Sequence, residues 1–266
     1  MSRRLITSLF LVPLIATAGA SLAPAYADAK VYSGADRDVP LARFQDPLCP
    51  GIIGVEQVQA ETMVGLIRQN AAELGLRLAD PQTCEANLIV AVIDNPKSYL
   101  EDLRKRKGYL FDWLGRDERQ ALFDAPGPAR TWTIVFTRSR DGLPVYRSQS
   151  LTDLPFTTME AAHSLIYVPT RRDIISSMVL IDKKAVQGLS VGQVAAYATM
   201  RGLSGEQAER LEAPGESILG LFGEGSKPAG LTRSDRIFLQ TLYSTKANNP
   251  AAITLALADT RIAGNE

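Results

Sequence analysis

Histidine is almost absent from this 266-residue sequence, which has His163 alone. A zinc site needs three or four nitrogen, sulfur or carboxylate ligands at one point, and one histidine cannot supply the usual set. The phosphate-binding patterns Gly-x-x-x-x-Gly-Lys and Gly-x-Gly-x-x-Gly are also missing, as is the Ser-x-x-Lys motif of acylating enzymes. We therefore expect neither a metal nor a cofactor.

A net charge is missing as well, because 29 basic residues balance 29 acidic ones. A protein that binds nucleic acid or an anionic membrane surface through its overall charge carries a basic excess. The composition therefore gives no reason to expect either as a partner. It leaves the oligomeric state open.

The N-terminal segment has the features of a signal peptide over residues 1–27. Ser2-Arg3-Arg4 is positive, residues 5–23 are apolar, and Ala25-Tyr26-Ala27 fits the small-x-small cleavage pattern. Cleavage after Ala27 removes two arginines and leaves 27 basic and 29 acidic residues. An uncleaved anchor and twin-arginine export are the alternatives. No later stretch is long and apolar enough to span a bilayer, so we expect a periplasmic or secreted protein.

The two cysteines, Cys49 and Cys84, both follow the predicted signal peptide. An even number of cysteines in an exported protein favours a disulfide. This bridge would close a loop of about 35 residues and stabilise the fold by roughly 3 to 4 kcal/mol. The alternative, a redox or metal-binding pair, lacks both Cys-x-x-Cys spacing and a nearby histidine.

Apolar periodicity predicts an α+β fold: a mixed β-sheet with packed helices, followed by a helical C-terminal part. Residues 28–47 are expected to be an extended N-terminal segment that packs only near Phe44 and Leu48, and 48–266 a single domain. Helices are expected over 55–75, 97–123 (in two pieces broken near Gly108), 190–202, 204–213, 231–245 and 249–262. Strands are expected over 87–94, 131–137, 145–150, 163–168 and 177–182, with a hairpin turn at Asp141-Gly142.

Three segments carry a family resemblance. They are Leu189-Ser190-Val191-Gly192-Gln193-Val194-Ala195-Ala196-Tyr197, Ser217-Ile218-Leu219-Gly220-Leu221-Phe222, and Leu231-Thr232-Arg233-Ser234-Asp235-Arg236 continuing to Leu242-Tyr243. Their order resembles the active helix, the Ser-Ile-Met-like turn and the closing helix of zincin metallopeptidases of the metzincin-like group. It is also similar to uncharacterised exported proteobacterial families of that type. The resemblance implies a zincin-like fold.

The chemistry implied by that resemblance is absent. Where the active helix of the family reads His-Glu-x-x-His, this chain has Gln193 and Tyr197 at the ligand positions and Val194 at the general-base position. The third-ligand position holds Leu203. Valine cannot accept a proton and leucine cannot bind a metal, so we expect no zinc and no peptidase activity by this mechanism.

Two functions of different class remain. The first is a non-catalytic domain that binds a peptide or an envelope protein, or serves as a scaffold, with Gln193, Tyr197 and His163 around a remnant cleft. In it, the strand at 177–182 would line the groove and pair with an extended peptide. The second is a hydrolase that uses His163 with a carboxylate such as Asp173 or Asp182. A purely structural exported protein is a further alternative.

Overall fold

The computed structural model describes residues 36–112, 114–145, 157, 167–205, 217–225 and 227–264. The predicted signal peptide and His163 lie outside these ranges, as do most of the strand expected over 163–168 and most of the helix expected over 204–213. Among the described residues, no helix has the length and apolarity needed to cross a membrane.

One sheet organises the structure. Its strands are β1 (Arg43–Phe44), β2 (Pro50–Ile53), β3 (Leu88–Ile93), β4 (Ala129–Ser139) and β5 (Thr170–Asp182). Strand β5 is central, because β1 and β3 pair with it in parallel on one side and β4 pairs with it antiparallel on the other. Strand β2 lies beyond β3, also parallel. The expected mixed sheet with packed helices is confirmed.

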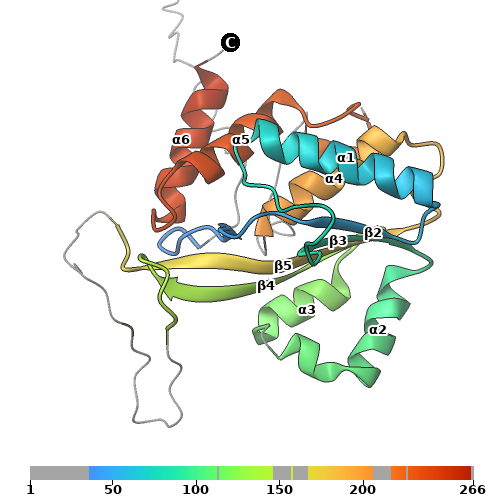
Figure 1. The fold of residues 1–266 in the computed structure, drawn as a ribbon, viewed down its shortest axis with the longest axis horizontal. Coiled ribbons are helices and arrows are strands. Elements are labelled where there is room, and N and C mark those ends of the chain that lie inside the picture. The colour runs from blue at the N-terminus through green and yellow to red at the C-terminus, as the bar shows by residue number, and fades with distance from the viewer. Residues whose placement is uncertain are drawn as a thin grey trace, which may run out of the picture.

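Helices cover both faces of this sheet (Figure 1). On one face lie α1 (Gln57–Glu73), α4 (Val191–Leu203), α5 (Arg233–Ser244) and α6 (Ala251–Ala263). The other face carries α2 (Pro96–Arg106) and α3 (Arg116–Asp124), joined through the 3-10 turn η1 (Gly108–Phe111). A second 3-10 turn, η3 (Ile218–Phe222), follows α4 in the chain. Both faces of the sheet are therefore covered.

The sheet accordingly has two hydrophobic cores. Leu88 and Val90 of β3 belong to the larger core beneath α1 and α4, whereas Ala91 belongs to the smaller core with α2 and α3. In the smaller core, Trp132 of β4 stacks on Phe111 with ring centroids 4.6 Å apart. The prediction that the strand over 87–94 is buried on both faces is confirmed, because an apolar run without alternation has to bury both of its sides.

The predicted disulfide is present. Cys49 and Cys84 are bonded, with their Cα atoms 6.2 Å apart. The bond joins the segment that enters β2 to the loop that enters β3. Asn87 adds a second connection at this point, because its Oδ1 accepts a hydrogen bond of 2.8 Å from the Cys49 amide.

Strand β4 has a long partner in addition to the hairpin that was expected. A tight turn does form at Asp141-Gly142, where the Gly142 amide donates to the Ser139 carbonyl and Gly142 has a φ of 92°. Beyond it, the structure shows one isolated bridge, between Arg138 and Pro144, and residues 146–150 lie outside the description. The long partner of β4 is β5, which pairs with it from Ala129 to Ser139. A turn signal specifies a reversal of the chain, but it does not specify how far the pairing extends.

The segment before β2 packs more closely than expected. Leu41 and Ala42 are buried in addition to Phe44 and Leu48. The carbonyls of Arg37 and Val39 accept hydrogen bonds from the first residues of α6, Ala252 and Ala251. These residues are therefore attached along two sides, to β5 through β1 and to the N-terminus of α6.

Candidate functional site

The two described residues of the predicted cleft lie on α4. Gln193 forms a capping box with Ser190: its amide donates to Ser190 Oγ at 3.2 Å, and its Oε1 accepts from the Ser190 amide at 3.0 Å. Gln193 Nε2 donates to the carbonyl of Pro228 at 2.9 Å. The side chain therefore ties the N-terminus of α4 to the loop before α5.

Tyr197, one turn further along α4, lies in the larger core. It is 2 % exposed, and its ring meets the ring of Phe222 edge-on at 4.7 Å. Its hydroxyl accepts a hydrogen bond of 3.1 Å from Arg201 Nε. Both side chains thus have packing or capping roles, and His163 lies outside the described residues. A cleft that joins the three stays a prediction.

A nucleophile-like pattern also occurs at this helix. Residues Gly188-Leu189-Ser190-Val191-Gly192 have the Gly-x-Ser-x-Gly spacing of a nucleophile elbow, in which the serine sits on a strained turn with an exposed hydroxyl. Ser190 instead has ordinary extended backbone angles, φ −75° and ψ 153°. Its Oγ caps α4. The geometry is that of a helix N-cap, which explains the serine without a catalytic role.

The other two segments of the resemblance meet at one buried carboxylate. Asp235 is fully buried and forms a capping box with Thr232, whose amide donates to Asp235 Oδ2 at 3.0 Å. The same carboxylate accepts bonds from Ser217 Oγ at 2.6 Å and from the Ile218 amide at 2.9 Å. Asp235 therefore joins the start of η3 to the start of α5.

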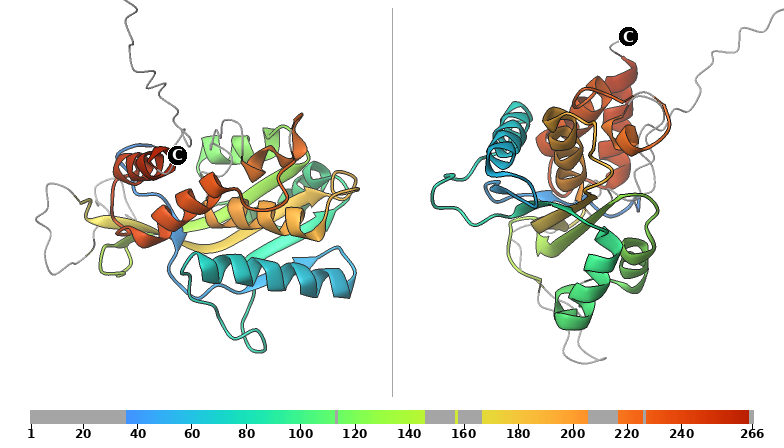
Figure 2. Two further views of the ribbon diagram at one scale, coloured as in Figure 1. Left: turned by 90° about the horizontal axis from the view of Figure 1, so that it is seen from above. Right: turned by 90° about the vertical axis from the view of Figure 1, so that its right-hand side faces the viewer.

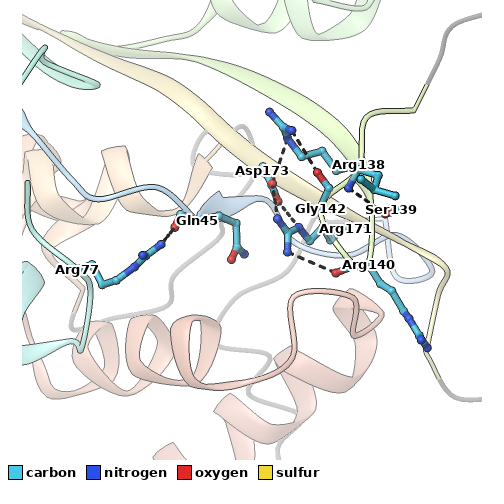
Figure 3. A network of polar contacts seen from close by, with 9 residues as sticks. Gln45, Arg77, Arg138, Ser139, Arg140, Gly142, Arg171 and Asp173 are labelled. Atoms are coloured by element: carbon cyan, nitrogen blue, oxygen red, sulfur yellow. Dashed lines mark hydrogen bonds and ion pairs between the residues drawn. The ribbon is translucent and has the colours of Figure 1, made fainter. Parts of the chain in front are cut away.

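A second buried carboxylate, Asp173, is the centre of a polar cluster at one end of β5 (Figure 3). It is 4 % exposed and faces two arginines. Arg171 Nε lies 3.0 Å from Asp173 Oδ1, and Arg138 Nε lies 3.4 Å from Oδ2. Antiparallel pairing explains the convergence, because it places Arg138 directly opposite Arg171 on the neighbouring strand.

Burial and charge act on the Asp173 carboxyl in opposite directions. Burial raises the pKa of Asp173 and is the largest influence, while attraction to Arg171 and Arg138 lowers it and the nearby charge of Asp46 raises it further. The balance leaves the pKa above the usual value. Asp173 is thus engaged by two guanidinium groups, as expected for a carboxylate that holds β4 and β5 together. The other candidate carboxylate, Asp182, caps a turn by accepting from the Lys184 amide.

A small polar cavity of about 150 Å³ lies beside this cluster, between β1 and the end of α1. Its lining includes Arg43, Gln45, Arg77 and Tyr243. Arg43 Nη1 donates to the carbonyls of Leu242 and Thr245, so it caps the C-terminus of α5. The Tyr243 hydroxyl donates to the Leu203 carbonyl, and burial raises the pKa of Tyr243. These contacts connect β1, α4 and α5, so Arg43 and Tyr243 serve the packing of these elements, whereas Gln45 Nε2 is buried without a hydrogen-bond partner.

Among the described strands, β4 rather than the strand over 177–182 lies at an edge of the sheet. The Asp182 amide donates to the Pro128 carbonyl at 2.8 Å, which fixes the antiparallel register. In an antiparallel strand, successive residues direct their backbone N–H and C=O groups to alternate sides. Those of Arg130 and Trp132 therefore face β5, and those of Ala129 and Thr133 face outward. Within the described part of the chain, no strand pairs with this outer edge. The expected groove-lining strand is internal, because β3 and β4 flank β5.

Over the same described ranges, no three side chains of histidine, cysteine, aspartate or glutamate come together as a metal site. Comparisons with protein-family models, with curated proteins and with solved structures find no match to this chain.

Proposed function

We propose that the protein is an exported, non-catalytic binding domain of the cell envelope, which holds an extended peptide along the outer edge of β4. The observation that carries the proposal is the outward direction of the backbone groups of Ala129 and Thr133, which are 7 % and 4 % exposed and which no described strand pairs with. An extended peptide satisfies such groups by adding a strand, and the backbone hydrogen bonds supply the affinity. The apolar segment at 5–23 and the disulfide support export.

The zincin resemblance fits this proposal if the domain keeps a peptide-binding strand and has lost the metal. In a peptidase of that family, the strand beside the active helix would hold the substrate. Here β4 would be the strand that holds the peptide. The replaced ligand positions, Gln193 and Tyr197, have become a capping residue and a core residue. A peptide held at β4 would therefore be retained rather than cleaved.

The charge near the end of β4 suggests which peptides fit. Arg138, Arg140 and Arg171 gather there, whereas the described carboxylates that pair with them are Asp141 and Asp173. The cluster therefore keeps a positive surplus beside the strand edge. Charges of this kind contribute mainly to selectivity and to the association rate. We expect a peptide with acidic residues at the end that lies beside Arg138 and Arg140.

A substitution at Thr133 tests the strand edge. Peptides would be selected from a displayed random library on the mature protein and their affinities measured by calorimetry. Thr133→Pro removes an outward N–H without removing a backbone bond to β5, and the side-chain bond to Ser177 that it loses is lost in Thr133→Val as well. We expect the affinity to fall by about tenfold, the effect of one lost backbone bond and its unpaired partner. Thr133→Val keeps the N–H and should bind nearly as the wild type does.

Three results would contradict the proposal. They are a selection that yields no binding peptide, peptides that bind Thr133→Pro as tightly as the wild type, and equal losses in the proline and valine variants. Thermal unfolding of each variant establishes that it is folded. If Thr133→Pro does not fold, hydrogen exchange on the wild type takes its place, and the peptide should then protect the Thr133 amide.

A further inference from the structure

A hollow on the opposite face of the sheet has no part in the proposal for β4. It lies between α2 and α3, has a volume of about 450 Å³, and is lined by Arg104, Arg116, Arg119, Gln120, Phe123 and Asp124. Figure 1 shows these two helices below the sheet, away from α1, α4, α5 and α6. Figure 2 shows the same separation after the view is turned about the vertical axis.

Helical spacing brings the lining residues of α3 together. Arg116, Arg119, Gln120 and Phe123 stand at positions i, i+3, i+4 and i+7, which share one face of a helix. Arg104 comes from the last turn of α2 and completes the lining from the other side. Three guanidinium groups from two helices thus border one hollow.

Two of the three arginines are held in place. The Arg104 guanidinium lies over the ring of Phe123, 4.7 Å from its centroid. Arg119 Nη2 donates a hydrogen bond of 2.8 Å to the Phe111 carbonyl, and Arg119 Nε is buried without a partner. Fixed guanidinium groups bind an anion at a smaller cost in side-chain entropy than mobile ones. The hollow is therefore partly organised for a ligand.

The positive charge of the hollow is not neutralised. Within the described ranges, no carboxylate lies at ion-pair distance from any of its three arginines. Acidic residues nearby have other contacts: Glu118 accepts from the Gly115 amide, and Asp102 pairs with Lys105. Asp124 is the single acid of the lining. The three guanidinium groups repel one another, and an anion placed among them would remove that repulsion.

We propose that this hollow binds a phosphate group. A phosphate carries close to two negative charges, which matches three arginines offset by Asp124, and its oxygens accept the paired N–H groups of guanidinium. Gln120 adds a neutral donor to the lining. The volume exceeds that of a phosphate, so the rest of the ligand has room within the same hollow. The phosphate belongs either to a small soluble molecule or to a phospholipid headgroup.

Binding to the mature protein tests the site with three probes: inorganic phosphate, pyrophosphate, and vesicles of phosphatidylglycerol compared with vesicles of phosphatidylcholine. Calorimetry measures the first two and co-sedimentation the third. Arg116→Gln removes a side chain without a described partner, so the fold should be retained. We expect this variant to weaken binding at least fivefold. Arg106→Gln removes the same charge from the end of α2 outside the hollow, and it should weaken binding less than twofold.

The outcomes separate the two sources. Binding of pyrophosphate without vesicle binding supports a soluble ligand, and binding to phosphatidylglycerol alone supports a lipid headgroup. In either case, Arg116→Gln must weaken the binding more than Arg106→Gln does. Equal losses would mean that binding follows net charge, and the proposal would be wrong. Failure of all probes to bind would also overturn it, and neither result would affect the peptide proposal, whose variants are at Thr133.

Discussion

Ser217 Oγ donates a hydrogen bond of 2.6 Å to the buried carboxylate of Asp235, which lies eighteen positions later in the chain. Asp235 also accepts bonds from the amides of Ile218 and Thr232. One side chain therefore satisfies three donors at the starts of η3 and α5. Since the residue is fully buried, no water can replace it.

Asp235→Ala should destabilise the protein strongly. It leaves the Ser217 hydroxyl and two backbone amides without their acceptor, and we expect a loss of about 3 to 5 kcal/mol in the free energy of unfolding. Urea denaturation followed by circular dichroism measures it. Asp141→Ala, at an exposed carboxylate paired with Arg140, is the control and should cost less than about 1 kcal/mol. Similar losses in the two variants would contradict the role of Asp235.

Residues of α4 give a second prediction, since the structure places Tyr197 in the core and Gln193 at the helix cap. Tyr197→Ala should cost about 3 to 5 kcal/mol through the cavity that it leaves. Tyr197→Phe keeps the ring, loses the bond from Arg201, and should cost about 1 kcal/mol. Gln193→Ala should cost about 1 kcal/mol through the lost cap. Denaturant titration of all three tests this order, and a Tyr197→Ala variant as stable as the wild type would contradict it.

The elements that the sequence predicts well are those whose signals are local. The helix over 55–75 appears as α1 and the helix over 231–245 as α5, because apolar periodicity lies within each segment and α5 also has a capping box at its start. The Cys49–Cys84 bond was predictable from the cysteine count and from the predicted signal peptide. In each case, the residues that determine the feature are the ones that display it.

The features that the sequence does not predict depend on distant partners. Strand β4 pairs with β5 across a long insertion, and no residue of β4 specifies that partner. Strand β1 has two residues, too few for a periodic pattern. The arginines around Asp173 come from two strands and meet through their register. The hollow between α2 and α3 could have been found in part, because Arg116, Arg119 and Phe123 share one helix face.

A third prediction concerns acid stability. Burial raises the pKa of Asp173 in the folded protein above its ordinary value of 3.8, so the folded state binds the proton more tightly than the unfolded state. Its contribution to stability is therefore fully present below pH 3.8 and is lost as the pH rises through the folded pKa. Compared with Asp173→Asn, which does not titrate, the wild type should lose stability from about pH 4 upward. Urea denaturation between pH 3 and pH 6 measures the difference, and a relative gain would show that attraction to Arg171 and Arg138 outweighs burial.

The last prediction concerns the contact between α4 and the sheet. A Cβ atom added to Gly202 would clash with Cδ1 of Leu88, a fully buried residue of β3. Gly202→Ala should therefore cost about 1 to 3 kcal/mol, although alanine is the better helix former. Gly65→Ala is the matched control, because Gly65 lies inside α1 with nothing within 4 Å of the new atom. It should stabilise the protein by about 0.5 to 1 kcal/mol.

Adding Leu88→Val makes room for the new methyl group, so Gly202→Ala should cost less in that background than in the wild type. Thermal and urea unfolding of the four variants and the wild type measure these differences, and an equal cost of Gly202→Ala in both backgrounds would show that Leu88 is not the residue that limits the approach of α4.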